Sequence, residues 1–80
     1  MNKEDILNEV INNVIFDIEN SYNDLDRDDV EDMIADELKG YDDDNLWRFE
    51  KNILDAIEEE VYVDYHEYDP TKDRFYIKNN

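Results

Sequence analysis

The stretch from residue 24 to residue 44 is the most strongly charged part of the chain. It holds eleven carboxylates against two basic residues, Arg27 and Lys39, and so carries nine of the 17 net negative charges. Like charges at this density repel one another in a compact protein, attract basic protein surfaces, and oppose binding to nucleic acid or anionic lipid. We therefore expect an acidic surface and a basic partner, with no direct binding to nucleic acid or membranes.

A net charge of −17 is typical of disorder, but the rest of the composition favours a folded chain. Hydrophobic residues make up 40% of the sequence, and only one Gly and one Pro occur in it. We expect a single acidic domain over residues 1–80, near the lower limit of what can bury a useful core. The absence of Cys favours an intracellular setting. No stretch reads as a signal peptide or a membrane span, so we expect a soluble, cytoplasmic protein.

Apolar periodicity predicts a first helix over residues 3–19. Asn2 is the expected N-cap, with Asp5 as its reciprocal partner. The aliphatic residues recur at helical spacing and form one continuous stripe: Ile6, Leu7, Val10, Ile11, Val14, Ile15 and Ile18.

Two further helices are predicted by shorter apolar patterns. The second covers residues 27–39, with Asp26 as its N-cap and Gly40 in the left-handed conformation that often ends a helix. The third covers residues 44–58, and the carboxylates before it are its expected caps: Asp42, Asp43 and Asp44. The acidic run 58–60 has no predicted cation partner.

The period changes from 3.6 to 2 at Val61, which predicts a strand. Residues 69–73 have turn composition, and residues 74–78 form the returning strand. The fold class is therefore α+β: a compact three-helix domain followed by a C-terminal two-stranded β-hairpin. A lone hairpin is marginal in water, so its strands must pack on the helices or pair with another chain. Alternatively, the third helix extends through Tyr65, because Ile57, Val61 and Tyr65 also follow helical spacing.

The sequence predicts no catalytic, cofactor or metal site. Calcium loops starting at Asp24 or Asp42 fail, because Asp29 and Trp47 would occupy the position that requires Gly. His66 is the only imidazole, and we interpret it as a polar strand residue. With 25 carboxylates present, any pairing into a general acid and base is uninformative. We therefore expect a protein that is not an enzyme.

The carboxylates of the second helix recur at regular spacing. Asp28, Asp32 and Asp36 stand about 6 Å apart along a helix, and DNA presents phosphates about every 3.4 Å of axis per strand. Charge runs are usually solvated surfaces, but here Lys and Arg are not interspersed. In size, pI near 4.1, lack of Cys and these carboxylate rows, the chain resembles the small DNA-mimic inhibitors of phages and mobile elements. That class includes anti-CRISPR proteins, anti-restriction proteins and inhibitors of uracil-DNA glycosylase.

The resemblance implies a non-enzymatic inhibitor, acting in a bacterial host cell, that blocks the basic DNA- or RNA-binding groove of a defence protein. A CRISPR-Cas effector is the first choice of target, and a restriction enzyme is another. The expected partner-binding residues are Tyr22, Asp24, Asp26, Asp28, Asp29, Glu31, Asp32, Asp36, Tyr41, Asp42, Asp43 and Asp44. Trp47 also flanks the acidic rows, but we expect it to be partly buried in the core.

A second hypothesis is an acidic interaction module or small regulator that uses its C-terminal hairpin. The hairpin would form a homodimer or extend the sheet of a partner that is not dedicated to nucleic acid. The aromatic residues available for this contact are Tyr62, Tyr65, Phe75 and Tyr76.

Overall fold

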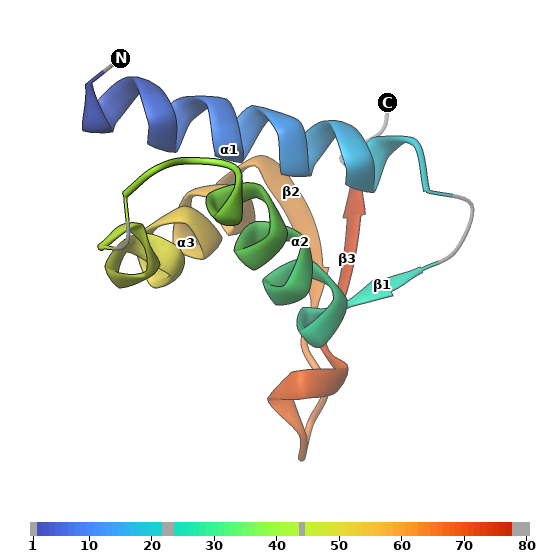
Figure 1. Cartoon of the computed structure of the whole chain (residues 1–80). Helices are drawn as coiled ribbons and strands as arrows, with labels where there is room; N and C mark the ends of the chain where they lie inside the picture. The colour runs from blue at the N-terminus through green and yellow to red at the C-terminus, as the bar shows by residue number, and fades with distance from the viewer. Residues whose placement is uncertain (1, 22–23, 44, 78–80) are drawn as a thin grey trace.

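The computed structural model describes residues 2–21, 24–43 and 45–77 (Figure 1). Its elements are α1 (Lys3–Glu19), β1 (Leu25–Asp26), α2 (Arg27–Lys39), the 3-10 helix η1 (Leu46–Phe49), α3 (Glu50–Glu60), β2 (Val61–Asp64), the 3-10 helix η2 (Pro70–Lys72) and β3 (Arg74–Ile77). The mixed class with three helices is confirmed. The predicted third helix differs in detail, because it begins as η1 and continues as α3.

The sheet has three antiparallel strands in the order β1-β3-β2, rather than the two strands of the predicted hairpin. β2 and β3 form that hairpin, with Val63 opposite Phe75. β1 pairs with the other edge of β3 and sets Leu25 opposite the same Phe75. The alternative helix through Tyr65 is wrong, since α3 ends at Glu60 and Val61 is already extended (φ −125°, ψ 166°). The run of carboxylates at the negative end of α3 disfavours its continuation.

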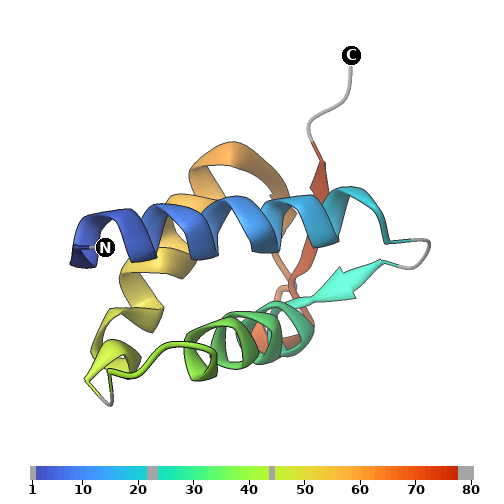
Figure 2. The same ribbon diagram turned by 45° about the horizontal axis from the view of Figure 1, so that its top comes forward.

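One hydrophobic core joins all three helices to the sheet. α1 crosses over α2 and α3 and also packs on β3 (Figures 1 and 2). Each helix buries the apolar face that its periodicity predicted. The buried core residues are Val10, Val14, Ile18, Val30, Ile34, Leu38, Leu46, Ile53, Leu54, Ile57, Val61 and Phe75. α2 is therefore held by its inner face, and its opposite face is left to the solvent.

The helix ends differ from expectation at three places. Asn2 caps α1 by accepting from the Asp5 N–H at 2.9 Å, but the Asp5 side chain makes no reciprocal bond. Gly40 follows α2 in a right-handed conformation (φ −73°), so the left-handed ending is wrong. Neither η1 nor α3 has a side-chain cap. Asp43 instead accepts from the Asn45 N–H at 2.9 Å, which closes a tight turn before η1.

A partly buried ion network ties the start of α2 to the end of α3 and to Asp73, which precedes β3. The Arg27 guanidinium lies 2.6 Å from Glu58 and 2.9 Å from Asp73, and it stacks over the Phe75 ring. Asp73 is only 2% exposed, and its second oxygen accepts from the His66 N–H at 2.6 Å. Glu58 is thus paired, contrary to expectation. Burial by itself would lower the pKa of Arg27, but hydrogen bonds to Glu58 and Asp73 outweigh this effect and raise it.

Candidate protein-interaction surface on α2

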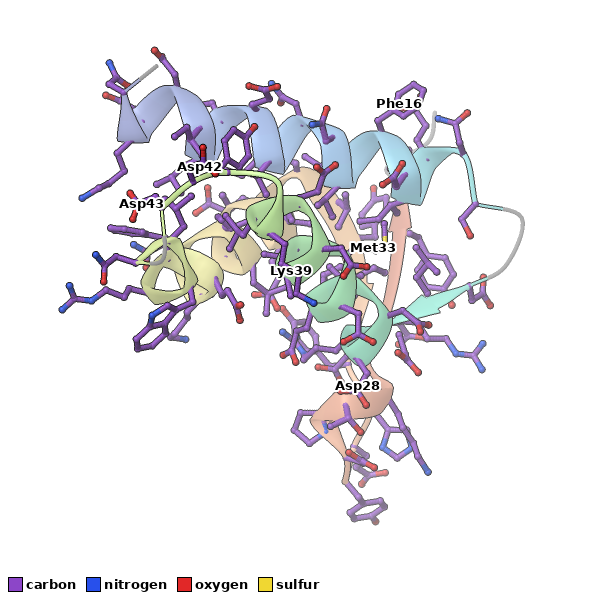
Figure 3. The ribbon with its side chains drawn as sticks, viewed as in Figure 1. Phe16, Asp28, Met33, Lys39, Asp42 and Asp43 are labelled. Carbon is purple, nitrogen blue, oxygen red and sulfur yellow. The ribbon has the colours of Figure 1, made fainter. Side chains whose placement is uncertain are left out.

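The outer face of α2 carries a row of exposed carboxylates, which we call the α2 ridge: Asp28, Asp32 and Asp36. The three residues are exposed and lie opposite the face that buries Val30 and Ile34. Steps of four residues place neighbouring ridge residues about 6 Å apart along the helix axis. Figure 3 shows Asp28 at the N-terminal end of α2 and Lys39 at the C-terminal end. The ridge is an exposed acidic row along the outer face of a packed helix.

Two of the predicted binding carboxylates, Asp26 and Asp29, hold the start of this helix in place. Asp26 accepts from the Asp29 N–H at 2.8 Å, and Asp29 accepts from the Asp26 N–H at 3.2 Å. This reciprocal pair is a complete capping box. Together with the ion network of Arg27, it fixes the position of Asp28. Asp26 and Asp29 therefore have a structural role besides the binding role predicted for them.

The other predicted residues are distributed around the ridge. Asp42 and Asp43 are exposed on the loop after α2 (Figure 3), and Glu31 is exposed on the side of α2 that faces α3. Asp24 pairs with Arg74 across the sheet edge at 3.0 Å. Tyr22 and Asp44 lie outside the described residues.

Tyr41 packs toward α1 rather than toward the ridge. It is partly buried against the core, and its phenol hydrogen-bonds with Glu9 of α1. Burial raises the pKa of Tyr41, and the negative charges of Glu9 and Glu37 raise it further. The geometry thus gives Tyr41 a packing role.

The basic residues are mostly engaged elsewhere, which leaves the ridge without compensation. Among the described residues, no cation lies within ion-pair distance of Asp28 or Asp32, and Asp36 meets only Lys39 at 3.7 Å. Both members of that pair are more than three-quarters exposed, so it contributes little. The remaining cation contacts run to the core framework or to α3: Arg27 with Glu58 and Asp73, Arg74 with Asp24, Lys51 with Asp55, and Lys3 over the Phe49 ring.

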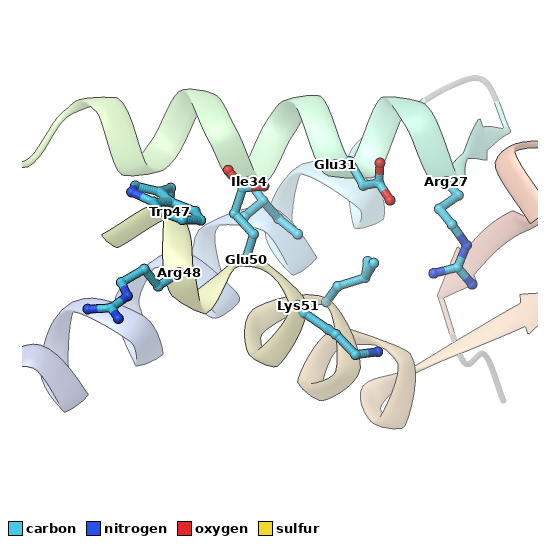
Figure 4. A pocket seen from close by; sticks show the side chains of 8 residues that line it. Arg27, Glu31, Ile34, Trp47, Arg48, Glu50 and Lys51 are labelled. Atoms are coloured by element: carbon cyan, nitrogen blue, oxygen red, sulfur yellow. The ribbon is translucent and has the colours of Figure 1, made fainter. Parts of the chain in front are cut away.

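Trp47 is the residue that the sequence analysis misplaced. We expected it to be partly buried, but its side chain is 66% exposed, because η1 turns Leu46 into the core in its place. The indole borders a groove of about 490 Å³ between α2 and the η1–α3 segment (Figure 4). Ile34 and Leu54 contribute apolar lining to this groove. The only feature of the sequence that could have indicated the exposure of Trp47 was its position next to Leu46, because just one member of this adjacent pair can face inward.

The aromatic residues of the hairpin differ from one another in exposure. Phe75 is buried, whereas Tyr65 lies beyond β2 and is exposed, as are Tyr62 and Tyr68. β2 is an edge strand of the sheet. The hairpin therefore presents exposed aromatic side chains that are distant from the ridge in the sequence.

Within the described residues, no cluster of three or more His, Asp or Glu side chains is arranged to hold a metal ion. In the same part of the chain, no helix has the length and apolar character needed to cross a bilayer. No protein-family profile, characterised protein or solved structure matches this chain. The physical arguments for function therefore come from the surface itself.

Proposed function

We propose that this protein is a non-enzymatic inhibitor that occupies the basic DNA- or RNA-binding groove of a host defence protein, and that a CRISPR-Cas effector is its first-choice target. The observation that carries the proposal is the α2 ridge: three carboxylates in line, exposed, and nearly free of compensating cations. Positively charged channels in such effectors hold nucleic acid by its backbone and geometry rather than by its sequence. A rigid carboxylate row offers the same kind of contact.

The rigidity of α2 supports this proposal over a solvated surface. A flexible acidic segment would lose conformational entropy on binding, whereas a helix held by a core face, a capping box and an ion network has already lost it. The charge that surrounds the ridge would steer a basic partner toward it and raise the association rate. Nucleic acid, which is repelled by this surface, would be a competitor and not a ligand.

The test is a triple variant of the ridge, Asp28→Asn, Asp32→Asn and Asp36→Asn, against a matched triple variant elsewhere. The control changes Glu4→Gln, Asp17→Asn and Glu60→Gln, which removes the same charge from exposed positions outside α2. Each protein is added to purified basic nucleic-acid-binding proteins, including CRISPR-Cas effectors and restriction enzymes. Target affinity is measured over a range of salt concentrations, with and without duplex DNA or guide RNA.

The ridge variant should bind its target on the order of tenfold more weakly and with a flatter salt dependence, because rim charges act on association and are screened by salt. The control should lose much less. Nucleic acid should compete with the unchanged protein for the target. Equal binding by the two triple variants, or a failure of nucleic acid to compete, would mean that the ridge is only a solvated face.

A second candidate function rests on the hairpin. β2 is an edge strand that bears the exposed Tyr62, and Tyr65 follows it directly. Such an edge can accept a strand from a partner or from a second copy of the chain. In that case the protein is an acidic regulator, and Tyr65→Ala should abolish binding or dimerisation while the ridge variant leaves it unchanged.

A further inference from the structure

The groove beside Trp47 combines an exposed aromatic ring with carboxylates that lack a cation partner. Trp47 and Glu50 border two neighbouring hollows, one of about 490 Å³ toward Ile34 and one of about 320 Å³ toward Leu38. The Trp47 indole thus lines both hollows, and the half-buried Glu50 lies close to it (Figure 4). Glu31 reaches into the first hollow from α2.

Three cations line this groove together with the two carboxylates: Arg27, Arg48 and Lys51. Arg27 is held by two carboxylates, and Lys51 meets Asp55 at 4.0 Å. Figure 4 shows the ends of Arg48 and Lys51 pointing away from the space between Trp47 and Glu31. Among the described residues, neither Glu31 nor Glu50 has an ion-pair partner. A positively charged group entering the groove beside Trp47 would therefore meet an aromatic face and Glu50, with Glu31 further along the groove.

We propose that this groove is the anchor of the interface and that it takes an arginine side chain of the basic partner. The proposal rests on the proposed function and names the specific contact within it. A guanidinium stacks on an indole through its planar face while its edge donates to a carboxylate, and arginine does this better than lysine. The apolar lining from Ile34 and Leu54 suits the aliphatic stem of such a side chain. Trp and Arg are the residues in which binding energy most often concentrates.

This anchor complements the α2 ridge. The ridge residues are exposed to water, where each ion pair contributes little and mainly speeds association. The groove lies along the same helix and offers partial shelter from water, where the same contacts are stronger.

Trp47 is the only tryptophan of the chain, so its fluorescence reports the groove directly. The probes are a short peptide that alternates arginine and glycine, its lysine counterpart of equal charge, and a glutamate counterpart. The arginine peptide should change the Trp47 emission and bind about fivefold or more tightly than the lysine peptide. Equal binding of the arginine and lysine peptides, or preferential binding of the glutamate peptide, would overturn the proposal.

Variants then separate the anchor from the ridge, with labelled peptide as the reporter. Trp47→Ala and Glu50→Gln should each weaken the arginine peptide about fivefold or more, and Trp47→Phe, which keeps a ring, should fall between Trp47→Ala and the parent. Asp17→Asn removes one exposed carboxylate on α1 and is the matched control. Circular dichroism checks that each variant is folded, which the exposure of Trp47 favours.

The same variants, assayed on a full-length target protein, distinguish the two proposals. If Trp47→Ala binds as the parent does while the ridge variant is weakened, the arginine anchor is wrong and the inhibitor function stands. If Trp47→Ala and Glu50→Gln weaken binding and the Asp17→Asn control does not, the anchor is supported.

Discussion

Replacing Arg27 by Met should destabilise the protein more than any other exchange of a single cation. Met keeps an apolar stem, but it removes both ion pairs and the guanidinium that lies over the Phe75 ring. Asp73 would keep only the His66 N–H as a donor among the partners described above. An almost fully buried carboxylate left without its counter-charge is the costly consequence.

The expected magnitude follows from the burial of the three side chains. Breaking a buried pair by removing one partner costs about 3–5 kcal/mol. Arg27 and Glu58 remain 16% and 21% exposed at their side chains, so solvent screens the network and the lower end applies, about 3 kcal/mol. For a domain of this size, each kcal/mol shifts the melting temperature by about 4–8 °C. The variant should thus melt about 12–24 °C lower.

Urea unfolding followed by helical circular dichroism measures this loss by linear extrapolation. Arg74→Met is the matched control, because Arg74 pairs with Asp24 in an exposed position and its loss should cost little. Adding Asp73→Asn to Arg27→Met removes the unpaired charge and should restore part of the stability. If Arg27→Met loses no more stability than Arg74→Met, the network is effectively solvated and the reasoning is refuted.

Three further predictions concern charge and capping. The melting temperature should rise from low to moderate salt as repulsion among carboxylates is screened; a fall would show that the acidic surface is already compensated within the fold. Asp26→Ala should lower the free energy of unfolding by about 1 kcal/mol, because Asp26 is the N-cap of α2, and Asp29→Ala should lower it by less. Equal losses of the two variants in urea titrations would contradict this prediction. The raised pKa of Tyr41 means that the unfolded chain ionises first, so stability should decline above about pH 10.0 as pH rises through the folded value. Tyr41→Phe should lack that part of the decline. Subtracting the phenol absorbance titration of Tyr41→Phe from that of the parent should leave a transition with its midpoint above pH 10.0. A midpoint at or below this value would show that Tyr41 is not held in its neutral form.

The helices could be predicted from the sequence because each carries its own local signal. The aliphatic stripe of α1 and the row of apolar residues in α2 require no knowledge of distant parts of the chain. The same holds for the α2 ridge, whose exposure follows from its position opposite Val30 and Ile34. Local periodicity therefore predicted both the scaffold and the acidic row of the candidate site.

The features that the sequence analysis missed all depend on residues far apart in the chain. β1 exists because Leu25 pairs with Phe75, and its neighbour Asp24 binds Arg74, which is 50 positions away. Arg27 and Asp73 are 46 positions apart. Nothing local distinguishes these residues from other charged residues of the chain. The exposure of Trp47 was missed for a related reason, since only the packed core decides whether Leu46 or Trp47 turns inward.

The placement of the cations explains how a strongly acidic chain can fold and still keep a bare carboxylate row. Arg27 and Arg74 tie the start of α2 and the strand β1 to the C-terminal hairpin, and loss of the Arg27 contact would be costly. The ridge contains two like-charge pairs at i, i+4 spacing, which together destabilise α2 by less than about 1 kcal/mol. That repulsion is small beside the expected contribution of the Arg27 network alone. The ridge can therefore be neutralised without unfolding the protein, so a loss of binding in the ridge variant would report on recognition rather than on stability.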